Sequence, residues 1–191
     1  MPRGVRHRLR LARHSPVIHD SFRDRFMDLS GLNLVPGAVR HERPHLHLLP
    51  LVLGGQSYAV TPEEIEARLD LQAASGGLYL KLGFAARVDG ACFRCLEPAY
   101  LVLDVRSSEY HDTRAPIDDE ELRCEYIADD QLDVERWAHD SLVFALPDKI
   151  LCRDDCAGLC PHCGIRLEPG AVHECVPEEL DTRWAKLRDL L

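Results

Sequence analysis

The 191-residue sequence contains no long apolar run, and no stretch approaches the roughly 20 apolar residues of a membrane-spanning helix. Its first ten residues are basic, but no apolar run of about seven or more follows them, so the sequence predicts no secretory signal. We therefore expect a cytoplasmic protein without a membrane segment. In that reducing compartment cysteines remain thiols or bind metal ions, and disulfide bonds are rare.

An excess of positive charge is also missing. The chain has 23 lysine and arginine residues against 32 aspartate and glutamate residues, which gives a formal charge of -9. This balance excludes a protein that coats nucleic acid through a broad basic face. Acidic residues gather between positions 112 and 135, a pattern that favours a solvated loop; the alternative is a docking surface for a basic partner. Arginines in the first residues predict a basic, flexible tail over residues 1–20.

Several common enzyme motifs are absent. We find no P-loop, no Gly-x-Gly-x-x-Gly after a strand and no nucleophile elbow. Internal repeats and low-complexity segments are missing as well. The length and the 46% hydrophobic content predict one ordinary domain with a core and a smaller appendage, and not two full domains.

What the chain does contain is a series of segments in which apolar and polar residues alternate, which predicts β-strands. Short turns, several with glycine, separate these segments and favour an antiparallel sheet, because parallel strands need a long crossover. Pro50 lies within one segment and favours an edge position for it. The expected strands cover residues 26–34, 46–53, 60–71, 78–88 and 100–110.

One main helix is predicted over residues 134–146, where apolar side chains recur at intervals of three and four. Asp130 or Asp133 can cap its N-terminus, and Pro147 ends it. A second, short helix with an apolar stripe is expected over residues 182–191.

Eight cysteines are the most informative feature of the chain. The segment Cys160-Pro-His-Cys163-Gly164 fits a zinc knuckle, in which a tight turn aims backbone N–H groups at the first sulfur and glycine accepts a positive φ. Cys92 and Cys95 have the same spacing without the glycine. Thiolates and imidazole at these spacings suit tetrahedral zinc. The candidate metal ligands are Cys92, Cys95, Cys152, Cys156, Cys160, Cys163, His173 and Cys175.

Two pairings of these ligands remain open. In the favoured pairing, Cys92 and Cys95 join Cys152 and Cys156, and a second zinc is bound by Cys160, Cys163, His173 and Cys175. The competing pairing uses Cys152, Cys156, Cys160 and Cys163 together and leaves Cys92 and Cys95 without partners. Cys124 stands alone and is expected to be a buried structural thiol.

Both sites of the favoured pairing are filled by four side chains, whereas a catalytic zinc keeps an open position. We therefore expect structural zinc and no enzymatic activity. The alternative is a zinc-dependent or dithiol redox enzyme that uses Cys160 and Cys163. Redox chemistry of that kind requires the first cysteine at a helix N-terminus, and the glycines and proline around Cys160 argue against such a placement.

Four segments together resemble the bacterial YceD family. They are Cys92-Phe-Arg-Cys95-Leu-Glu-Pro98, Phe144-Ala-Leu-Pro147, the cysteine-rich string from Leu151 to Gly164, and Asp181-Thr-Arg-Trp-Ala-Lys-Leu187. The resemblance implies a non-enzymatic factor for accumulation or processing of 23S ribosomal RNA and for large-subunit assembly. It implies partners among large-subunit components, either a ribosomal protein or the 23S rRNA precursor, and no small-molecule substrate. A Cys-x-Cys of many relatives falls on His173 and Cys175, so histidine replaces the first thiolate here.

The expected fold class is α+β. An antiparallel β-sheet domain packed with one main helix is expected over residues 21–151. A small cysteine-rich, zinc-binding segment with the C-terminal helix is expected over residues 152–191, after the tail of residues 1–20.

Overall fold

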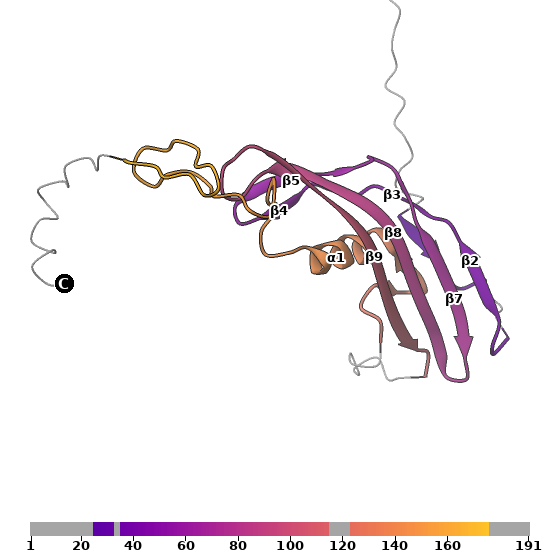
Figure 1. The fold of residues 1–191 in the computed structure, drawn as a ribbon. Helices are drawn as coiled ribbons and strands as arrows, with labels where there is room; N and C mark the ends of the chain where they lie inside the picture. The colour runs from indigo at the N-terminus through magenta and orange to yellow at the C-terminus, as the bar shows by residue number, and fades with distance from the viewer. Residues whose placement is uncertain (1–24, 33–34, 115–122, 176–191) are drawn as a thin grey trace, which may run out of the picture.

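The computed structural model describes residues 25–32, 35–114 and 123–175. Within these ranges the fold is rich in antiparallel strands and contains one helix (Figure 1). The elements are β1 (Phe26–Asp28), β2 (Val39–Glu42), β3 (His45–Leu46), β4 (Leu51–Leu53), β5 (Gln56–Thr61), β6 (Ile65–Glu66), β7 (Arg68–Ala74), β8 (Gly77–Ala91), β9 (Pro98–Asp112), β10 (Ile127–Ala128), β11 (Gln131–Asp133) and α1 (Val134–Ala145). The predicted α+β class is confirmed.

The main sheet is organised around the long hairpin of β8 and β9. The two strands pair along their whole length, from Gly77 opposite Asp112 to Ala91 opposite Pro98. The other edge of β8 pairs with β7 and β5, and the full order is β2-β7-β8-β5-β4 with β9 beside β8. Cys92 and Cys95 lie in the connection between β8 and β9. This connection is at one end of the sheet (Figure 1).

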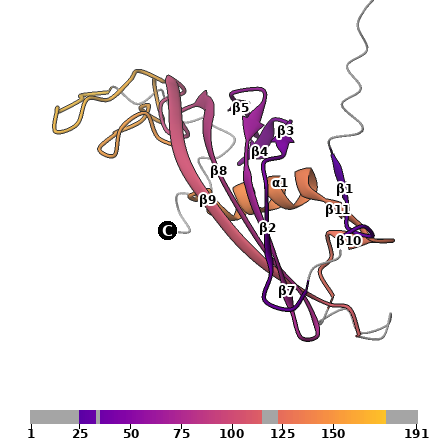
Figure 2. The same cartoon turned by 90° about the vertical axis from the view of Figure 1, so that its right-hand side faces the viewer.

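The core lies between this sheet and α1. Alternate residues of β8, among them Leu80, Leu82 and Val88, are buried, as the period of two in a strand requires. From α1, Trp137 and Leu142 are buried, and the indole Nε1 of Trp137 donates to Ser107 Oγ of β9 at 3.0 Å. The helix therefore covers one face of the sheet, as Figure 2 shows.

Asp133 begins the helix and connects it to the N-terminal strand. Its carboxylate accepts from the backbone N–H of Arg136 at 3.0 Å, which satisfies one of the free N–H groups of the first turn. The same carboxylate accepts from the Arg25 guanidinium at 2.8 Å. Of the two predicted caps, the structure therefore selects Asp133. The predicted helix itself is confirmed, ending at Ala145.

The predicted strands differ from the observed ones mainly at prolines. The single strand expected over residues 60–71 is wrong, because the chain leaves β5 before Pro62 and resumes as β6 and β7. Proline has no N–H for the ladder and interrupts strands in this way. Likewise, residues 46–53 divide into the short strands β3 and β4 on either side of residues 47–50. Beyond Gly54 and Gly55, β5 pairs with β4, which lies at the sheet edge as Pro50 predicted.

At the N-terminal side, the strand expected over residues 26–34 is shorter, since β1 ends at Asp28. It lies at the edge of a small sheet with the order β1-β11-β10. The predicted tail of residues 1–20 and the helix of residues 182–191 lie outside the described residues. Within the described ranges, no helix is long and apolar enough to cross a membrane.

Candidate metal centres

Two clusters of metal-ligating side chains lie at the end of the β8–β9 hairpin and beyond it. The inner cluster consists of Cys92, Cys95, Cys152 and Cys156. The outer cluster consists of Cys160, Cys163, His173 and Cys175. In each, the possible ligand atoms all lie within 4.8 Å of one another. The structure therefore brings together the two groups of the favoured pairing, and it does not assemble the competing group of four consecutive cysteines.

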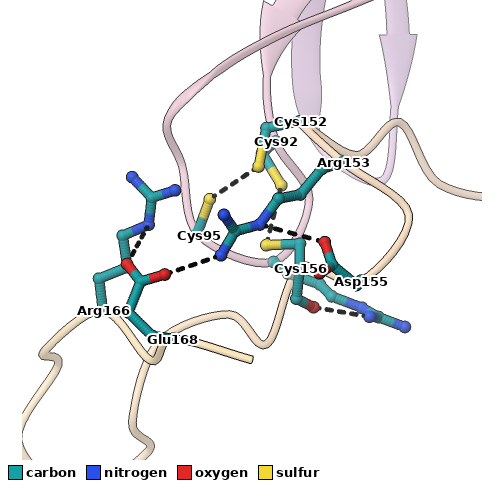
Figure 3. Close-up of polar contacts among 9 residues, drawn as sticks. Cys92, Cys95, Cys152, Arg153, Asp155, Cys156, Arg166 and Glu168 are labelled. Carbon is teal, nitrogen blue, oxygen red and sulfur yellow. Dashed lines mark hydrogen bonds and ion pairs between the residues drawn. The ribbon is translucent and has the colours of Figure 1, made fainter. Parts of the chain in front are cut away.

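The inner cluster joins two segments that are far apart in the sequence. Cys92 Sγ lies 3.8 Å from Cys156 Sγ, and Cys95 Sγ lies 3.5 Å from Cys152 Sγ (Figure 3). A tetrahedral zinc with bonds of about 2.3 Å holds its sulfur ligands roughly 3.8 Å apart. Three of the four cysteines are buried, and Cys152 is half-buried. The spacing and the all-sulfur donor set therefore fit zinc.

The thiols of the inner cluster influence one another's protonation. Burial raises the pKa of Cys92, but the backbone N–H groups of Cys152, Cys95 and Arg94 outweigh burial and bring this pKa to about 6. Burial and the neighbouring sulfurs raise the pKa of Cys152 to about 12. Four thiols packed this closely cannot all lose their protons without a cation to offset the charge. A divalent metal would supply that charge, and thiolates are the form that binds such an ion.

Two backbone turns of the same design provide the first pair of ligands in each cluster. In the inner turn, Cys92 N donates to Glu97 O at 2.7 Å and Leu96 N to Cys92 O at 3.0 Å. In the outer turn, Cys160 N donates to Ile165 O at 2.8 Å and Gly164 N to Cys160 O at 2.9 Å. Both segments are therefore knuckles with the same hydrogen-bond pattern.

Leu96 takes the place of glycine in the inner knuckle. Its φ is 64°, close to the 71° of Gly164, so a side chain that disfavours the left-handed region occupies it here. The backbone of the turn therefore overrides the preference of this residue. The sequence shows that the glycine is missing here, but it carries no signal that leucine adopts the conformation of glycine.

The outer cluster is more open to solvent. Cys160 is buried, Cys175 is half-buried, and Cys163 and His173 are exposed. Cys163 Sγ lies 3.3 Å from His173 Nε2. The backbone N–H groups of Cys163 and His162 point at the first sulfur and lower the pKa of Cys160 to about 6. Hydrogen bonding with Cys163, together with burial, raises the pKa of Cys175 to about 11. Three sulfurs and one imidazole nitrogen are again a donor set that suits zinc.

The β8–β9 turn holds the segment after α1 through backbone contacts. Phe93 N donates to Ile150 O at 2.8 Å, and Arg94 Nη1 donates to Cys156 O at 2.7 Å. Gly158 has a φ of 84°, and a Cβ there would lie 3.2 Å from Arg94 O. Glycine is thus required both for the backbone conformation and for the close approach. These contacts place the outer cluster directly beyond the inner one.

Side-chain ion pairs continue this connection along the surface (Figure 3). The Arg153 guanidinium lies 3.2 Å from Asp155 and 3.0 Å from Glu168, and Arg166 lies 3.7 Å from Glu97. Exposed pairs of this kind contribute little to stability, on the order of 0–1 kcal/mol each. Order in this region therefore depends mainly on the clusters and the backbone contacts.

The remaining residues singled out from the sequence lie elsewhere. Cys124 is buried and belongs to neither cluster, and burial raises its thiol pKa to about 11. It is a structural thiol, as expected. Within the acidic stretch, Asp133 is the buried helix cap and not part of an open surface. Residues 115–122 of that stretch lie outside the described ranges.

Comparison with known proteins gives one family match and several uncharacterized relatives. A family model described as "Large ribosomal RNA subunit accumulation protein YceD" matches residues 80–191. Uncharacterized proteins of Mycobacterium tuberculosis (Rv2926c) and Mycobacterium bovis (Mb2951c) are each 32% identical over 197 residues, covering 98% of this chain and 93% of the relative. An uncharacterized protein of Mycobacterium leprae (ML1660) is 33% identical over 105 residues, covering 52% of this chain and 46% of that protein. No solved structure matches the chain.

Proposed function

The chain belongs to the YceD family, and on that premise we propose that it is a non-enzymatic cytoplasmic factor for accumulation of the large ribosomal RNA. In this role it promotes processing of 23S rRNA and assembly of the large ribosomal subunit. Its partners are large-subunit components, either a ribosomal protein or the 23S precursor. Two zinc ions stabilise its shape.

The observation that supports a structural role for the metal is the closure of both clusters. Each offers four ligand atoms within 4.8 Å of one another, so a tetrahedral ion is saturated by protein. Catalytic zinc needs a free position for water or substrate. The inner cluster also ties the sheet to the segment after α1, where a metal contributes to folding. These features favour a scaffold for binding over an enzyme.

The low pKa of Cys160 would also be expected if the protein were the alternative, a dithiol redox enzyme. A thiol with a pKa of about 6 is the kind that attacks disulfides. In this chain, however, the N–H groups that lower the pKa belong to a knuckle turn and not to a helix N-terminus. The same N–H groups stabilise a metal-bound thiolate.

Metal content and thiol titration separate the two candidates. The purified full-length chain is expected to contain about two zinc ions, and to show no rapidly reacting thiol until a chelator is added. Cys124 serves as the internal reference, because its buried thiol belongs to neither cluster. A zinc-free chain with a rapidly reacting thiol at Cys160 would support the redox enzyme instead.

The ribosomal role is tested in cells. Depletion of the protein is expected to reduce mature 23S rRNA, to increase its precursor and to lower the amount of large subunits, while 16S rRNA stays unchanged. Affinity purification from the same cells is expected to recover large-subunit components. Normal large subunits after depletion would refute the proposal.

A further inference from the structure

The face of the main sheet opposite α1 is open to solvent. Ser107 of β9 contacts the helix, so its neighbour Arg106 projects to the other side, as alternate residues of a strand do. On β8 the same open face carries Lys81, Ala85 and Arg87, which are all exposed. Figure 2 shows α1 on one side of β8 and β9 only. We call this surface the open face.

A hollow of about 680 Å³ lies in the open face across β7, β8 and β9. Its floor includes Gly83 and Ala85, whose small size leaves the space above the sheet empty. The strand register places Gly83 directly between Arg68 of β7 and Arg106 of β9. Since neighbouring strands are about 4.8 Å apart, the two arginine backbones flank the glycine at roughly 10 Å from each other. Lys81 follows on the same face two residues away.

The cations around this hollow are available to a ligand. Arg68 and Arg106 form ion pairs with Asp70 at 3.2 Å and Asp104 at 2.9 Å, but the arginine side chains are 71% and 83% exposed. Exposed ion pairs are weak and exchange readily with other anions. Lys81 forms no ion pair with any described residue, and its ammonium lies 5.3 Å from the centre of the Tyr79 ring. Among the described residues, an incoming anion therefore meets one cation that has no ion pair and two whose ion pairs are weak.

Aromatic rings stand on the same face beside these cations. Tyr79 lines the hollow and lies opposite Tyr110 in the neighbouring strand. Farther along the hairpin, the guanidinium of Arg87 covers the ring of Tyr100 at 4.0 Å. Rings and guanidinium planes of this kind are the surfaces on which unpaired bases stack.

The charge of the open face contrasts with that of the whole chain. Four cations, Arg68, Lys81, Arg87 and Arg106, stand there with four carboxylates, Asp70, Asp89, Asp104 and Asp112, for a local balance of zero, whereas the chain carries -9. A local concentration of cations interleaved with tyrosines on an open sheet suits a single nucleic-acid strand. A duplex has no exposed base faces to stack on these rings.

We propose that the open face binds a single-stranded RNA segment, with phosphates over Lys81, Arg68 and Arg106 and an unpaired base on Tyr79. This inference rests on the proposed ribosomal function and specifies how RNA is contacted. It assigns recognition to the sheet and leaves the metal clusters as a structural unit at its end.

The test measures binding of a fluorescently labelled, unstructured 12-nucleotide RNA to the zinc-loaded full chain by anisotropy, between 50 and 200 mM salt. For single strands the slope of log K against log salt is about -0.7 per phosphate contact. Lys81→Ala and Arg106→Ala are each expected to weaken binding and to reduce the slope by about 0.7. Tyr79→Leu is expected to weaken binding by roughly five- to a hundredfold with the slope unchanged, since stacking does not involve counterions.

Matched controls lie away from the hollow. Lys149→Ala removes a lysine that also stands over an aromatic ring, at 5.0 Å from Phe93. Arg136→Ala removes an arginine that also pairs with a carboxylate, from α1 on the other side of the sheet. Both controls are expected to bind RNA like the unchanged chain, and circular dichroism confirms that each variant is folded.

Two results would overturn the inference. One is the absence of RNA binding at 50 mM salt, and the other is an equal change of slope in the open-face variants and their controls. The outcome in cells is independent of both. If depletion reduces 23S rRNA but the chain binds no RNA, the proposed function stands and the open face is a surface for a protein partner. If 23S rRNA is unaffected by depletion, the proposed function fails whatever the binding result.

Discussion

Replacing Cys160 by serine removes one ligand of the outer cluster and tests whether metal orders that part of the chain. Residues 161–174 are exposed throughout except for the half-buried Leu167, so they bury almost no apolar surface. Fixing their backbone costs about 1–2 kcal/mol per residue. The few backbone hydrogen bonds there, such as Leu167 N to Gly158 O, contribute roughly 1 kcal/mol each.

In the proposed zinc-bound protein, metal binding would supply the missing free energy. Structural zinc in zinc-finger peptides contributes an apparent 10–16 kcal/mol, which is enough to order a segment without a core. We therefore expect Cys160→Ser to bind one zinc ion in place of two and to lose the fold of residues 160–175. The sheet is expected to remain intact, because its core lies between the strands and α1.

Hydrogen exchange measures this effect directly. The amide N–H groups of Gly164 and Leu167 donate to Cys160 O and Gly158 O. In the variant, both amides are expected to exchange at the rate of an unfolded peptide. Amides of β8 and β9 are expected to keep their protection. His162→Ala is the matched control, because this exposed residue lies between two ligands and outside the cluster. Unchanged protection of Gly164 and Leu167 in Cys160→Ser would refute the reasoning.

Three further predictions follow from other parts of the fold. Cys92→Ser should raise the rate of amide hydrogen exchange at Phe93 and over residues 152–156, since the inner cluster no longer holds these two segments together. A loss of protection confined to residues after Gly158 would contradict this prediction. Asp133→Ala should lower the free energy of unfolding in urea by about 2 kcal/mol, through loss of the helix cap and of the ion pair with Arg25, whereas Asp133→Asn keeps the cap and should lose less. Burial raises the pKa of Asp133, but Arg25 and the Arg136 N–H outweigh it and hold this pKa below the ordinary value. The stabilisation by the Asp133 carboxylate is therefore complete above the ordinary carboxyl pKa, and it is lost as pH falls through the lowered pKa. The difference in free energy of unfolding between the parent chain and Asp133→Ala should therefore shrink in acid. A difference that stays constant with pH would argue against this link between protonation and stability. Gly90→Ala should destabilise by about 1–3 kcal/mol in the same urea assay, because its Cβ would lie 2.2 Å from the buried Tyr58 ring, whereas Gly83→Ala meets only Val105 O at 3.8 Å and should be nearly neutral.

The sequence predicted most accurately the features that depend on local chemistry. The helix over residues 134–145 follows from its apolar period, its cap and Pro147, and the strands expected over residues 78–88 and 100–110 lie within β8 and β9. The two Cys-x-x-Cys turns are local signals as well, whereas the sequence left two pairings of the cysteines open, because Cys92 and Cys95 meet Cys152 and Cys156 only through the fold. The local signals lie within a few residues of one another, where spacing determines geometry.

Features that depend on distant contacts could not be predicted in this way. The break before Pro62 divides one alternating segment into β5, β6 and β7, which pair with different neighbours. The positive φ of Leu96 is imposed by the hydrogen bonds of its knuckle and not by the residue itself. The hollow over Gly83 appears only when β7 and β9 place an arginine on each side of it. Each of these depends on register or tertiary contact, for which a single sequence gives no direct signal.

The different sequence separation of the ligands in the two clusters implies an order in which metal is acquired during folding. Cys163 and His173 are 10 positions apart, whereas Cys95 and Cys152 are separated by 57 and Cys92 and Cys156 by 64. Closing the longer loop in an unfolded chain costs about 1.5 kcal/mol more. The outer cluster can therefore capture an ion while the rest of the chain is still unfolded. In the proposed zinc-bound protein the inner cluster would fill after the outer one, once the hairpin and α1 have brought its cysteines together, so its occupancy would follow the folding of the domain.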